Sequence, residues 1–202
     1  MIEADGELKD NRAPIQSLRS GVFFGTRLRF SQEDAARFSK LERIGRDYEV
    51  VDIMKIIDNR LERLSVLVTG GIPLIHADIG TGELIPIPMM GEGMVRMLSI
   101  ILGIMSYDGG IILIDELENG LHYSVLQQVW TAIAESARKN HVQIFATTHS
   151  WECIRAAHRA FENTTPYDFR LHRLERNDGI INVVTYDQAT IETSLDLNLE
   201  IR

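Results

Sequence analysis

The stretch at residues 110–116 constrains the fold of this chain more than any other part of the sequence. Four consecutive aliphatic residues, Ile111 to Ile114, follow a glycine pair and lead directly into Asp115 and Glu116. A run that is apolar on both faces is typical of a central strand in a sheet covered on both sides. The two acids then stand at the carboxyl end of the strand, where α/β sheets bind ligands. Strands also end in charges simply because the chain leaves the core, so the neighbouring segments must decide between the two interpretations.

The segment after the acid pair predicts a parallel β-α-β unit. A strand is expected at 142–146, and Thr147-Thr148-His149-Ser150 follows it. Parallel strands joined by a helix end at the same edge of their sheet. The sequence therefore predicts Asp115, Glu116 and His149 at one edge, on neighbouring strands. The intervening helix is indicated by apolar residues at helical spacing: Val125, Leu126, Val129, Trp130, Ile133 and Ala137.

The first part of the chain predicts a short strand at 22–24, two helices and a β meander. Apolar residues recur at helical spacing from 32 to about 45 and again from 50 to 64. His76 lies in the meander with no second ligand nearby, so we interpret it as an ordinary strand residue. The meander is expected at 65–68, 73–76 and 84–87, with turns at Gly70-Gly71 and Gly80-Thr81-Gly82.

Gly91-Glu92-Gly93 opens a run that is apolar almost all round as far as Met105. Such a pattern indicates a buried helix, and its glycine-flanked start exposes free backbone N–H groups. A helix start of this kind is an anion site by geometry and dipole, although glycines also occur at ordinary helix starts. Further on, Ser150 can cap a helix to about residue 160, and Asn177-Asp178-Gly179 predicts a β-hairpin between 169–175 and 180–186.

Composition narrows the class of protein. The net charge of −8 argues against wholesale nonspecific binding to nucleic acid. Residues 12–46 nevertheless carry eight basic and three acidic side chains, which we interpret as a solvated helix face or as an arm that faces nucleic acid or a partner. The single cysteine, Cys153, excludes an internal disulfide. With no membrane-spanning run and no signal-peptide core at the start, we expect a cytoplasmic protein with no membrane contact.

Three elements therefore converge: an anion-ready helix start at 91–93, an acid pair at 115–116 and a histidine at 149. Their order, with a buried β-α-β unit between the last two, predicts phosphoryl-transfer chemistry. One carboxylate would position Mg²⁺, the second would orient water, and the histidine could donate to a γ-phosphate oxygen.

This order of motifs resembles the C-terminal half of an ABC-type ATPase domain, in the AAA-like group related to the overcoming-lysogenization-defect, RecF and SMC proteins. The resemblance covers about 84–176 and is strongest over 110–150. It implies an α/β fold with the parallel sheet of a P-loop NTPase, and ATP and Mg²⁺ as cofactors. Residues 1–90 would form a variable helical lobe and β meander, and residues 91–202 the C-terminal part of the ATPase core, ending in a β-hairpin.

The resemblance also implies roles for single residues. Asp115 would bind Mg²⁺ at the end of the Walker B strand, Glu116 would be the catalytic base, and His149 would be the catalytic switch histidine. The signature motif, which reaches the nucleotide of a second subunit, and the D-loop would contribute the nucleotide-binding residues Gly91, Glu92, Gly93, Asn119 and His122. The sequence departs from the family in two of these places, because the signature serine is absent and His122 stands where transporters carry aspartate.

A Walker A loop is absent from the sequence. The pattern G-x-x-x-x-G-K-[ST] needs a Gly-Lys pair, and the chain contains none. Without that loop nothing cradles the β- and γ-phosphates. We therefore expect ATP hydrolysis only if the loop comes from upstream or from another chain. The expected partners are a second copy in a head-to-tail dimer through the signature and D-loop, and a separate N-terminal half or a nuclease subunit. Nucleic acid is a further partner that the sequence leaves open.

The alternative is a catalytically inactive fragment of the ATPase fold that acts as a protein-interaction module. A nuclease within this chain is disfavoured, because the segment after His149 contains no D-x-D pair. The process that such an ATPase would drive, whether DNA repair, phage defence or another, is not readable from the residues.

Overall fold

The computed structural model describes residues 20–26, 32–177 and 180–197. Its centre is a three-stranded parallel sheet in the order β1-β5-β6, formed by Gly21–Phe24, Ile111–Ile114 and Gln143–Ala146. Val22 pairs with Ile112, which in turn pairs with Ile144. The predicted parallel β-α-β unit is confirmed, and the short strand expected at 22–24 pairs with it.

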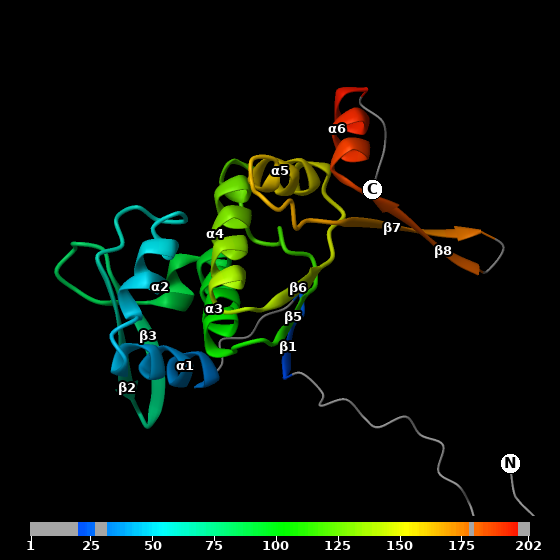
Figure 1. Cartoon of the computed structure of the whole chain (residues 1–202). Coiled ribbons are helices and arrows are strands. Elements are labelled where there is room, and N and C mark those ends of the chain that lie inside the picture. The colour runs from blue at the N-terminus through cyan, green and yellow to red at the C-terminus, as the bar shows by residue number, and fades with distance from the viewer. Residues whose placement is uncertain (1–19, 27–31, 178–179, 198–202) are drawn as a thin grey trace, which may run out of the picture.

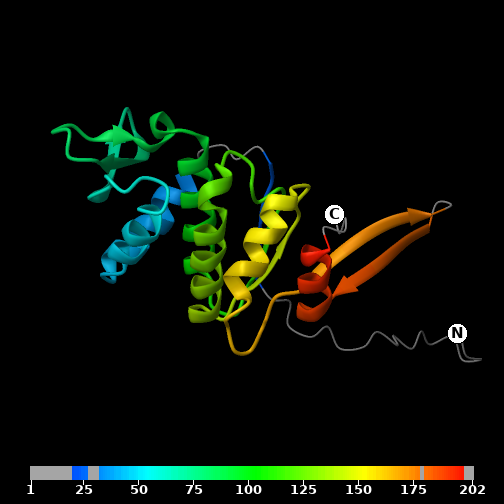
Figure 2. The same cartoon turned by 90° about the horizontal axis from the view of Figure 1, so that it is seen from above.

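Helices α3 (Glu92–Ser106) and α4 (Leu126–Lys139) pack beside the sheet, and α5 (Trp151–Phe161) lies against α4 (Figures 1 and 2). The side chains of Phe24, Ile112 and Ile114 are buried in the same core as these helices. Helix α3 is buried on nearly every side because it also contacts α1 and α2, which explains its lack of a polar face.

The lobe before α3 contains α1 (Gln32–Arg43), α2 (Asp47–Met54) and an antiparallel sheet in the order β2-β3-β4. Its strands are Arg63–Thr69, Ile72–Asp78 and Ile85–Pro86, which confirms the predicted meander, and the 3-10 turn Ile87–Met90 leads into α3. His76 lies in β3, and its Nδ1 is 2.9 Å from the carbonyl oxygen of Leu74 in the same strand. The basic span 12–46 falls partly outside the described residues. Within them, Arg37 and Arg46 form ion pairs with nearby acids.

The prediction of a helix as far as residue 64 is wrong, because α2 ends at Met54. The carboxylate of Asp58 accepts hydrogen bonds from the backbone N–H of Arg60 and from its guanidinium, at 3.1, 2.9 and 2.7 Å. A side chain that bonds local backbone in this way favours a turn over a helix at residues 58–60, beyond the end of α2. Leu61 and Leu64 are still buried, and Leu64 lies in β2. Their apolar spacing therefore indicated that these residues are buried, but not that they form a helix.

The C-terminal hairpin is confirmed as β7 (Leu171–Asn177) and β8 (Ile180–Tyr186), with its turn at 178–179 outside the described residues. It projects from the body of the molecule (Figures 1 and 2). Helix α6 (Gln188–Asp196), which the sequence analysis did not predict, follows it, and the Asp187 side chain caps it. No helix in the described ranges is sufficiently long and apolar to cross a bilayer. The division of the chain at residue 90 stays a prediction. β1, before that point, pairs with β5, after it.

We predict that Gly103→Ala lowers the free energy of unfolding by about 1–3 kcal/mol, in spite of the better helix propensity of alanine. A Cβ at Gly103 would lie 2.4 Å from Cζ of the buried Phe24 ring, so α3 would be pushed off β1. Urea unfolding followed by circular dichroism measures the change. Gln128→Ala, at an exposed position of α4, should stay within about 0.5 kcal/mol of wild type. Equal stability of Gly103→Ala and wild type would contradict the close packing.

Candidate functional site

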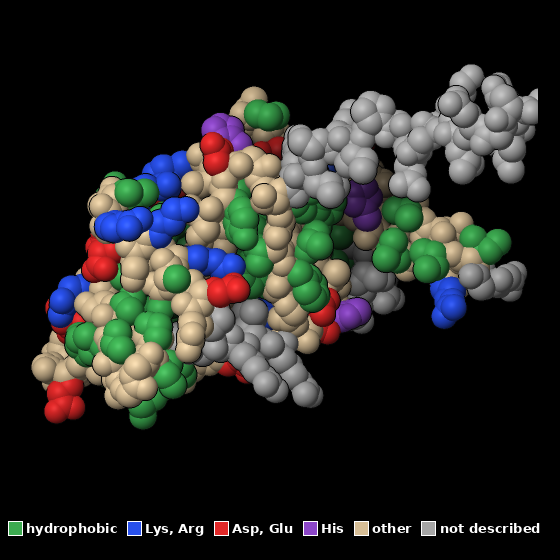
Figure 3. Space-filling view, turned by 90° about the horizontal axis from the view of Figure 1, so that it is seen from below, with side chains coloured by type: hydrophobic (Ala, Val, Ile, Leu, Met, Phe, Trp, Pro, Cys, Tyr) green, Lys and Arg blue, Asp and Glu red, His purple; other side chains and the backbone are tan. Residues whose placement is uncertain are grey.

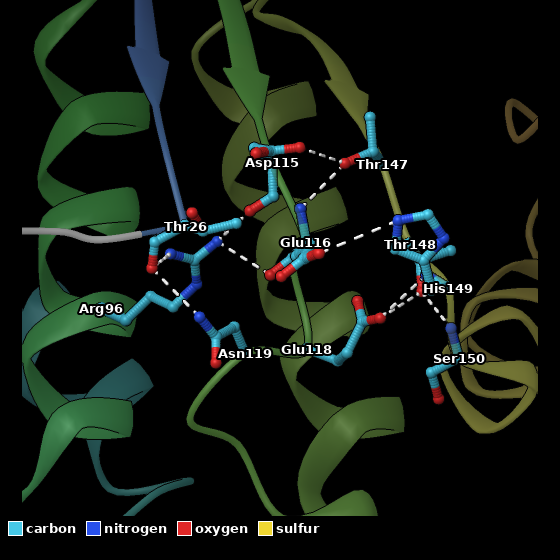
Figure 4. A network of polar contacts seen from close by, with 10 residues as sticks. All are labelled: Thr26, Arg96, Asp115, Glu116, Glu118, Asn119, Thr147, Thr148, His149 and Ser150. Atoms are coloured by element: carbon cyan, nitrogen blue, oxygen red, sulfur yellow. Dashed lines mark hydrogen bonds and ion pairs between the residues drawn. The ribbon is translucent and has the colours of Figure 1, made fainter.

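Thr147, directly after β6, holds the acid pair at the end of β5 (Figure 4). Its hydroxyl donates to Oδ1 of Asp115 at 2.7 Å and accepts the backbone N–H of Glu116 at 2.9 Å. The backbone N–H of Asp115 still donates to the Phe24 carbonyl of β1 at 2.8 Å. One threonine therefore fixes both the Asp115 carboxylate and the point where the chain leaves the sheet.

The backbone of Glu116 adopts a left-handed conformation with φ at 50°. Non-glycine residues rarely adopt this conformation, and it persists only where the surroundings hold it. Here the Thr147 hydroxyl holds its N–H, and Arg96 holds its carbonyl at 2.9 Å. Strained residues of this kind are common at functional sites, and among the described residues His141 is the other non-glycine residue with a positive φ.

His149 lies at the same edge as the acid pair, as the strand order predicts. Its Nε2 is 3.8 Å from Oε1 of Glu116, and the imidazole is 85% exposed, so the ring faces solvent rather than the core. Oε1 of Glu118 accepts the backbone N–H of His149 at 3.1 Å and the hydroxyl of Thr148 at 2.7 Å. Glu118 therefore positions the histidine segment from the loop that follows β5. Its buried Oε2 has no hydrogen-bond partner among the described residues.

Arg96 is the buried cation beneath the acid pair, with 1% of its surface exposed. Its guanidinium donates to the carbonyls of Gly25 and Glu116, each at 2.9 Å, and to the carbonyl of Asp115. These bonds join the ends of β1 and β5 to the second turn of α3. Burial lowers the pKa of Arg96, and the nearby carboxylates, of which Asp115 acts most strongly, offset part of that shift.

The glycine-led start of α3 packs against the loop that carries the acids. Gly91 has φ 104° and ψ 160°, a conformation that is essentially restricted to glycine, and no side chain caps the helix. A Cβ on Gly93 would lie 2.4 Å from the carbonyl oxygen of Gly120. Gly91 and Glu92 are exposed, whereas Gly93 is half-buried and Met94 is buried, so only the very start of the helix faces solvent.

Two residues of the predicted D-loop differ in how they connect to the site. The Asn119 amide donates to the carbonyl of Thr26 at 3.0 Å, which ties the loop to the end of β1. His122 is exposed, and its Nδ1 is 2.8 Å from the Ser124 hydroxyl, within its own turn. Among the described residues, the structure therefore brings Asp115, Glu116 and His149 together but does not join His122 to them.

The donor set around Asp115 suits Mg²⁺ held together with a phosphate. Within the described part of the chain no cluster of three or more His, Cys, Asp or Glu side chains could hold a metal alone. Mg²⁺ is usually bound through one or two carboxylates, with water and substrate phosphates completing the octahedron. Asp115, which the Thr147 hydroxyl orients, could supply the one carboxylate that such a site needs.

Sequence reasoning missed three residues that position the site: Arg96, Glu118 and Thr147. Arg96 had a readable signal, since it is a lone charge inside an apolar helix. The roles of Glu118 and Thr147 become visible only in the structure, where the loops after β5 and β6 lie side by side.

Arg96→Met should lower the free energy of unfolding by about 3 kcal/mol, because several partly buried carbonyls lose their donor. Arg96→Lys should recover only part of it, since an ammonium cannot reach the same carbonyls as the planar guanidinium. Urea unfolding of both variants checks this, and Arg155→Met, at an exposed position of α5, serves as the control. A methionine variant as stable as wild type would show that Arg96 does not hold the two strands together.

Comparisons with known proteins agree with this geometry. Residues 3–154 match the AAA ATPase domain family. An ATP/GTP phosphatase of Helicobacter pylori is 28% identical over 139 residues, which cover 67% of this chain and 37% of that protein. The uncharacterized protein MJECL11 of Methanocaldococcus jannaschii is 40% identical over 65 residues, or 32% of this chain and 57% of that protein. The matched regions thus span less than two thirds of each relative.

Solved structures show the same fold at low identity. An SMC ATPase, studied for ATP-driven dimerization and DNA-stimulated activation, matches with a TM-score of 0.51 and 14% identity, covering 82% of this chain and 99% of that one. An SMC head bound to the C-terminal winged-helix domain of ScpA matches with a TM-score of 0.50 and 15% identity, covering 74% and 43%. These likenesses confirm the expected P-loop NTPase fold. Because the family match covers most of its length, the chain belongs to the AAA ATPase domain family.

Proposed function

We propose that this chain is the C-terminal portion of an ATPase site, which binds Mg-ATP and hydrolyses it when a phosphate-binding loop completes it. The observation that carries the proposal is the meeting of Asp115, Glu116 and His149 at one sheet edge, with 3.8 Å between the Glu116 carboxylate and the His149 ring. Membership of the AAA ATPase domain family supports it.

Each of the three side chains has a role that its surroundings support. Asp115 would hold Mg²⁺, which neutralises charge on the phosphates when bound. Glu116 would accept a proton from the attacking water, and its strained backbone is held by neighbours that fix where the carboxylate can reach. His149 would donate to a γ-phosphate oxygen, and its ring is exposed to solvent beside the Glu116 carboxylate.

The phosphate-binding loop would come from another segment or another polypeptide. The chain has no Gly-Lys pair, and the match to the Helicobacter pylori phosphatase covers 37% of that protein. A separate N-terminal half that carries the loop is therefore the partner we propose first. A nuclease subunit and nucleic acid are further candidates, and the SMC neighbour's DNA-stimulated activation is a property of that protein.

A head-to-tail dimer would complete the site from the other side. Gly91, Glu92 and His122 are exposed, and the bonds of His122 stay within its own turn, so these residues are available to the nucleotide of a second subunit. ATP-driven dimerization of the SMC neighbour is in keeping with this arrangement. In this scheme residues 1–90 contribute the lobe together with β1, which pairs with β5 of the core, and residues 91–202 form the C-terminal part of the core.

A catalytically inactive interaction module is the second candidate, favoured by the absent Gly-Lys pair. The two candidates differ in one measurable respect. An ATPase half gains turnover when a loop-bearing segment is added, whereas an interaction module does not.

We predict no measurable ATP hydrolysis by the chain alone, and hydrolysis when it is mixed with a segment that contains G-x-x-x-x-G-K-[ST]. In that mixture Glu116→Gln should abolish phosphate release and leave ATP binding intact, because the amide cannot accept the proton of water. Glu135→Gln, at an exposed position of α4, is the matched control and should hydrolyse normally. Unchanged hydrolysis by Glu116→Gln would remove Glu116 from the mechanism, and hydrolysis by the chain alone would mean that it contains a phosphate-binding loop.

His149→Ala should slow hydrolysis in the same mixture by about 10²–10⁴-fold, the range typical of proton-transferring groups. The ring is exposed, so thermal unfolding should be unchanged. His141→Ala, which removes another exposed imidazole, is the control. A turnover rate for His149→Ala equal to that of His141→Ala would show that the switch histidine has no part in catalysis.

A further inference from the structure

The C-terminal β7–β8 hairpin carries an exposed apolar surface. Its root is fastened to the body by a small apolar cluster that includes Ile154 of α5, Leu171 and Tyr186. Beyond the root the hairpin projects from the body, and hydrophobic side chains gather on it at the right of Figure 3. The exposed apolar side chains of the two strands are Leu174, Ile180, Ile181, Val183 and Val184.

A hairpin of two strands is a weak structure by itself. Sheets become stable in water with three or more strands and an apolar face, or with a helix packed on them. Among the described strands, β7 and β8 form a sheet of two. Helix α6 follows β8 directly and packs at the root through Ile191, so it leaves the projecting part exposed. That part therefore suits further strands beside it.

The outer edges of the two strands differ in how they are protected. Charged side chains on an edge strand hinder its pairing with another chain. Strand β7 carries Arg173, Glu175 and Arg176, whereas β8, at 180–186, has no charged residue, no proline and no glycine. A long uncharged strand rich in β-branched residues is a template for pairing. We therefore expect a further strand beside β8 rather than beside β7.

We propose that β8 pairs in antiparallel direction with β8 of a second copy of this chain, so that two hairpins form one four-stranded sheet. The copies would be related by a two-fold axis at Val183, the middle residue of β8, and all seven residues of the strand would then find a partner. This contact is separate from the head-to-tail contact at the start of α3 and the loop after β5. It does not depend on ATP binding or hydrolysis.

The side-chain pattern of β8 favours a second copy as the occupant. In the hairpin, Val183 lies directly opposite Leu174, on the same face of the sheet. Across the two-fold axis, Val183 would lie opposite Val183 of the second copy. One face of the new sheet would thus carry an unbroken apolar row of two leucines and two valines, and such cross-strand pairs stabilise a sheet. Because β8 is uncharged, no like charges meet when it pairs with itself.

The charges of β7 would end the assembly at two copies. In the four-stranded sheet β8 occupies the centre, and β7 of each copy forms an outer edge. Arg173, Glu175 and Arg176 then lie along both edges, where charged side chains oppose the addition of another strand. A two-fold contact is also closed, because each copy uses the same surface once. We therefore expect a dimer and not a fibre.

The first test is sedimentation velocity of the purified full chain without nucleotide. The concentration series should reach about 100 µM, because an edge contact of this size is expected to be weak. We expect a dimer whose fraction rises with concentration. His122→Ala should leave it in place, because His122 belongs to the separate head-to-tail contact. A monomer at every concentration, or a dimer that His122→Ala abolishes, would overturn the proposal.

The second test places charges on the two-fold axis. Val183→Lys should weaken the dimer by on the order of tenfold or more, because two ammonium groups would face each other. Leu174→Lys is the matched control, since Leu174 lies on the same face and is 69% exposed against 59% for Val183. A mixture of Val183→Lys and Val183→Glu should regain the dimer. Equal effects of Val183→Lys and Leu174→Lys, or no recovery in the mixture, would contradict the axis at Val183.

The third test uses cysteine and also covers the case in which Val183→Lys does not fold. Residues directly opposite in antiparallel strands have Cα atoms about 4.5–5.5 Å apart, within the range of a disulfide. Val183→Cys should therefore form a disulfide-linked dimer under mild oxidation, seen on a non-reducing gel, whereas Leu174→Cys should not. The native Cys153 is buried and should not react. A disulfide in Leu174→Cys but not in Val183→Cys, or in neither variant, would overturn the proposal.

Discussion

The hydrogen bonds of the buried Arg96 guanidinium hold together the parts on which the site depends. They tie helix α3 to the carbonyls at the ends of β1 and β5, where the chain would otherwise leave the sheet in two separate loops. A planar donor group can serve several carbonyls at once, which a single ammonium cannot do. Arg96 thus links the start of α3 to the acid pair, which Thr147 holds from the other side.

The charges around this arginine suggest why a nucleotide would need a cation. Asp115, Glu116 and Glu118 lie close enough to Arg96 to act on its pKa, and Glu92 does so from the start of α3. Several carboxylates therefore surround one buried guanidinium, an environment that repels a free triphosphate. A magnesium ion at Asp115 would offset most of that local negative charge, which fits chemistry in which metal and nucleotide bind together.

Most of the fold was predictable, because it depends on local signals. The aliphatic run before Asp115, the helix pattern after it and the next strand predicted a parallel sheet, and the strand order follows from topology. The second helix was overextended because Leu61 and Leu64 are buried at helical spacing in a segment that is not helical. Within that segment the Asp58 side chain bonds the backbone of Arg60 in a turn, which apolar periodicity does not indicate.

The sequence by itself determined which residues stand at the carboxyl ends of β5 and β6, since strand order and chain direction follow from the order of elements. It also determined that no phosphate-binding loop of the Gly-Lys type is present. Only the tertiary structure decided how the site is held: Thr147 joins Asp115 and Glu116, Glu118 reaches the histidine segment, and Arg96 reaches two strands. These contacts join residues far apart in the chain. Packing between distant segments creates them, and a linear pattern does not encode it.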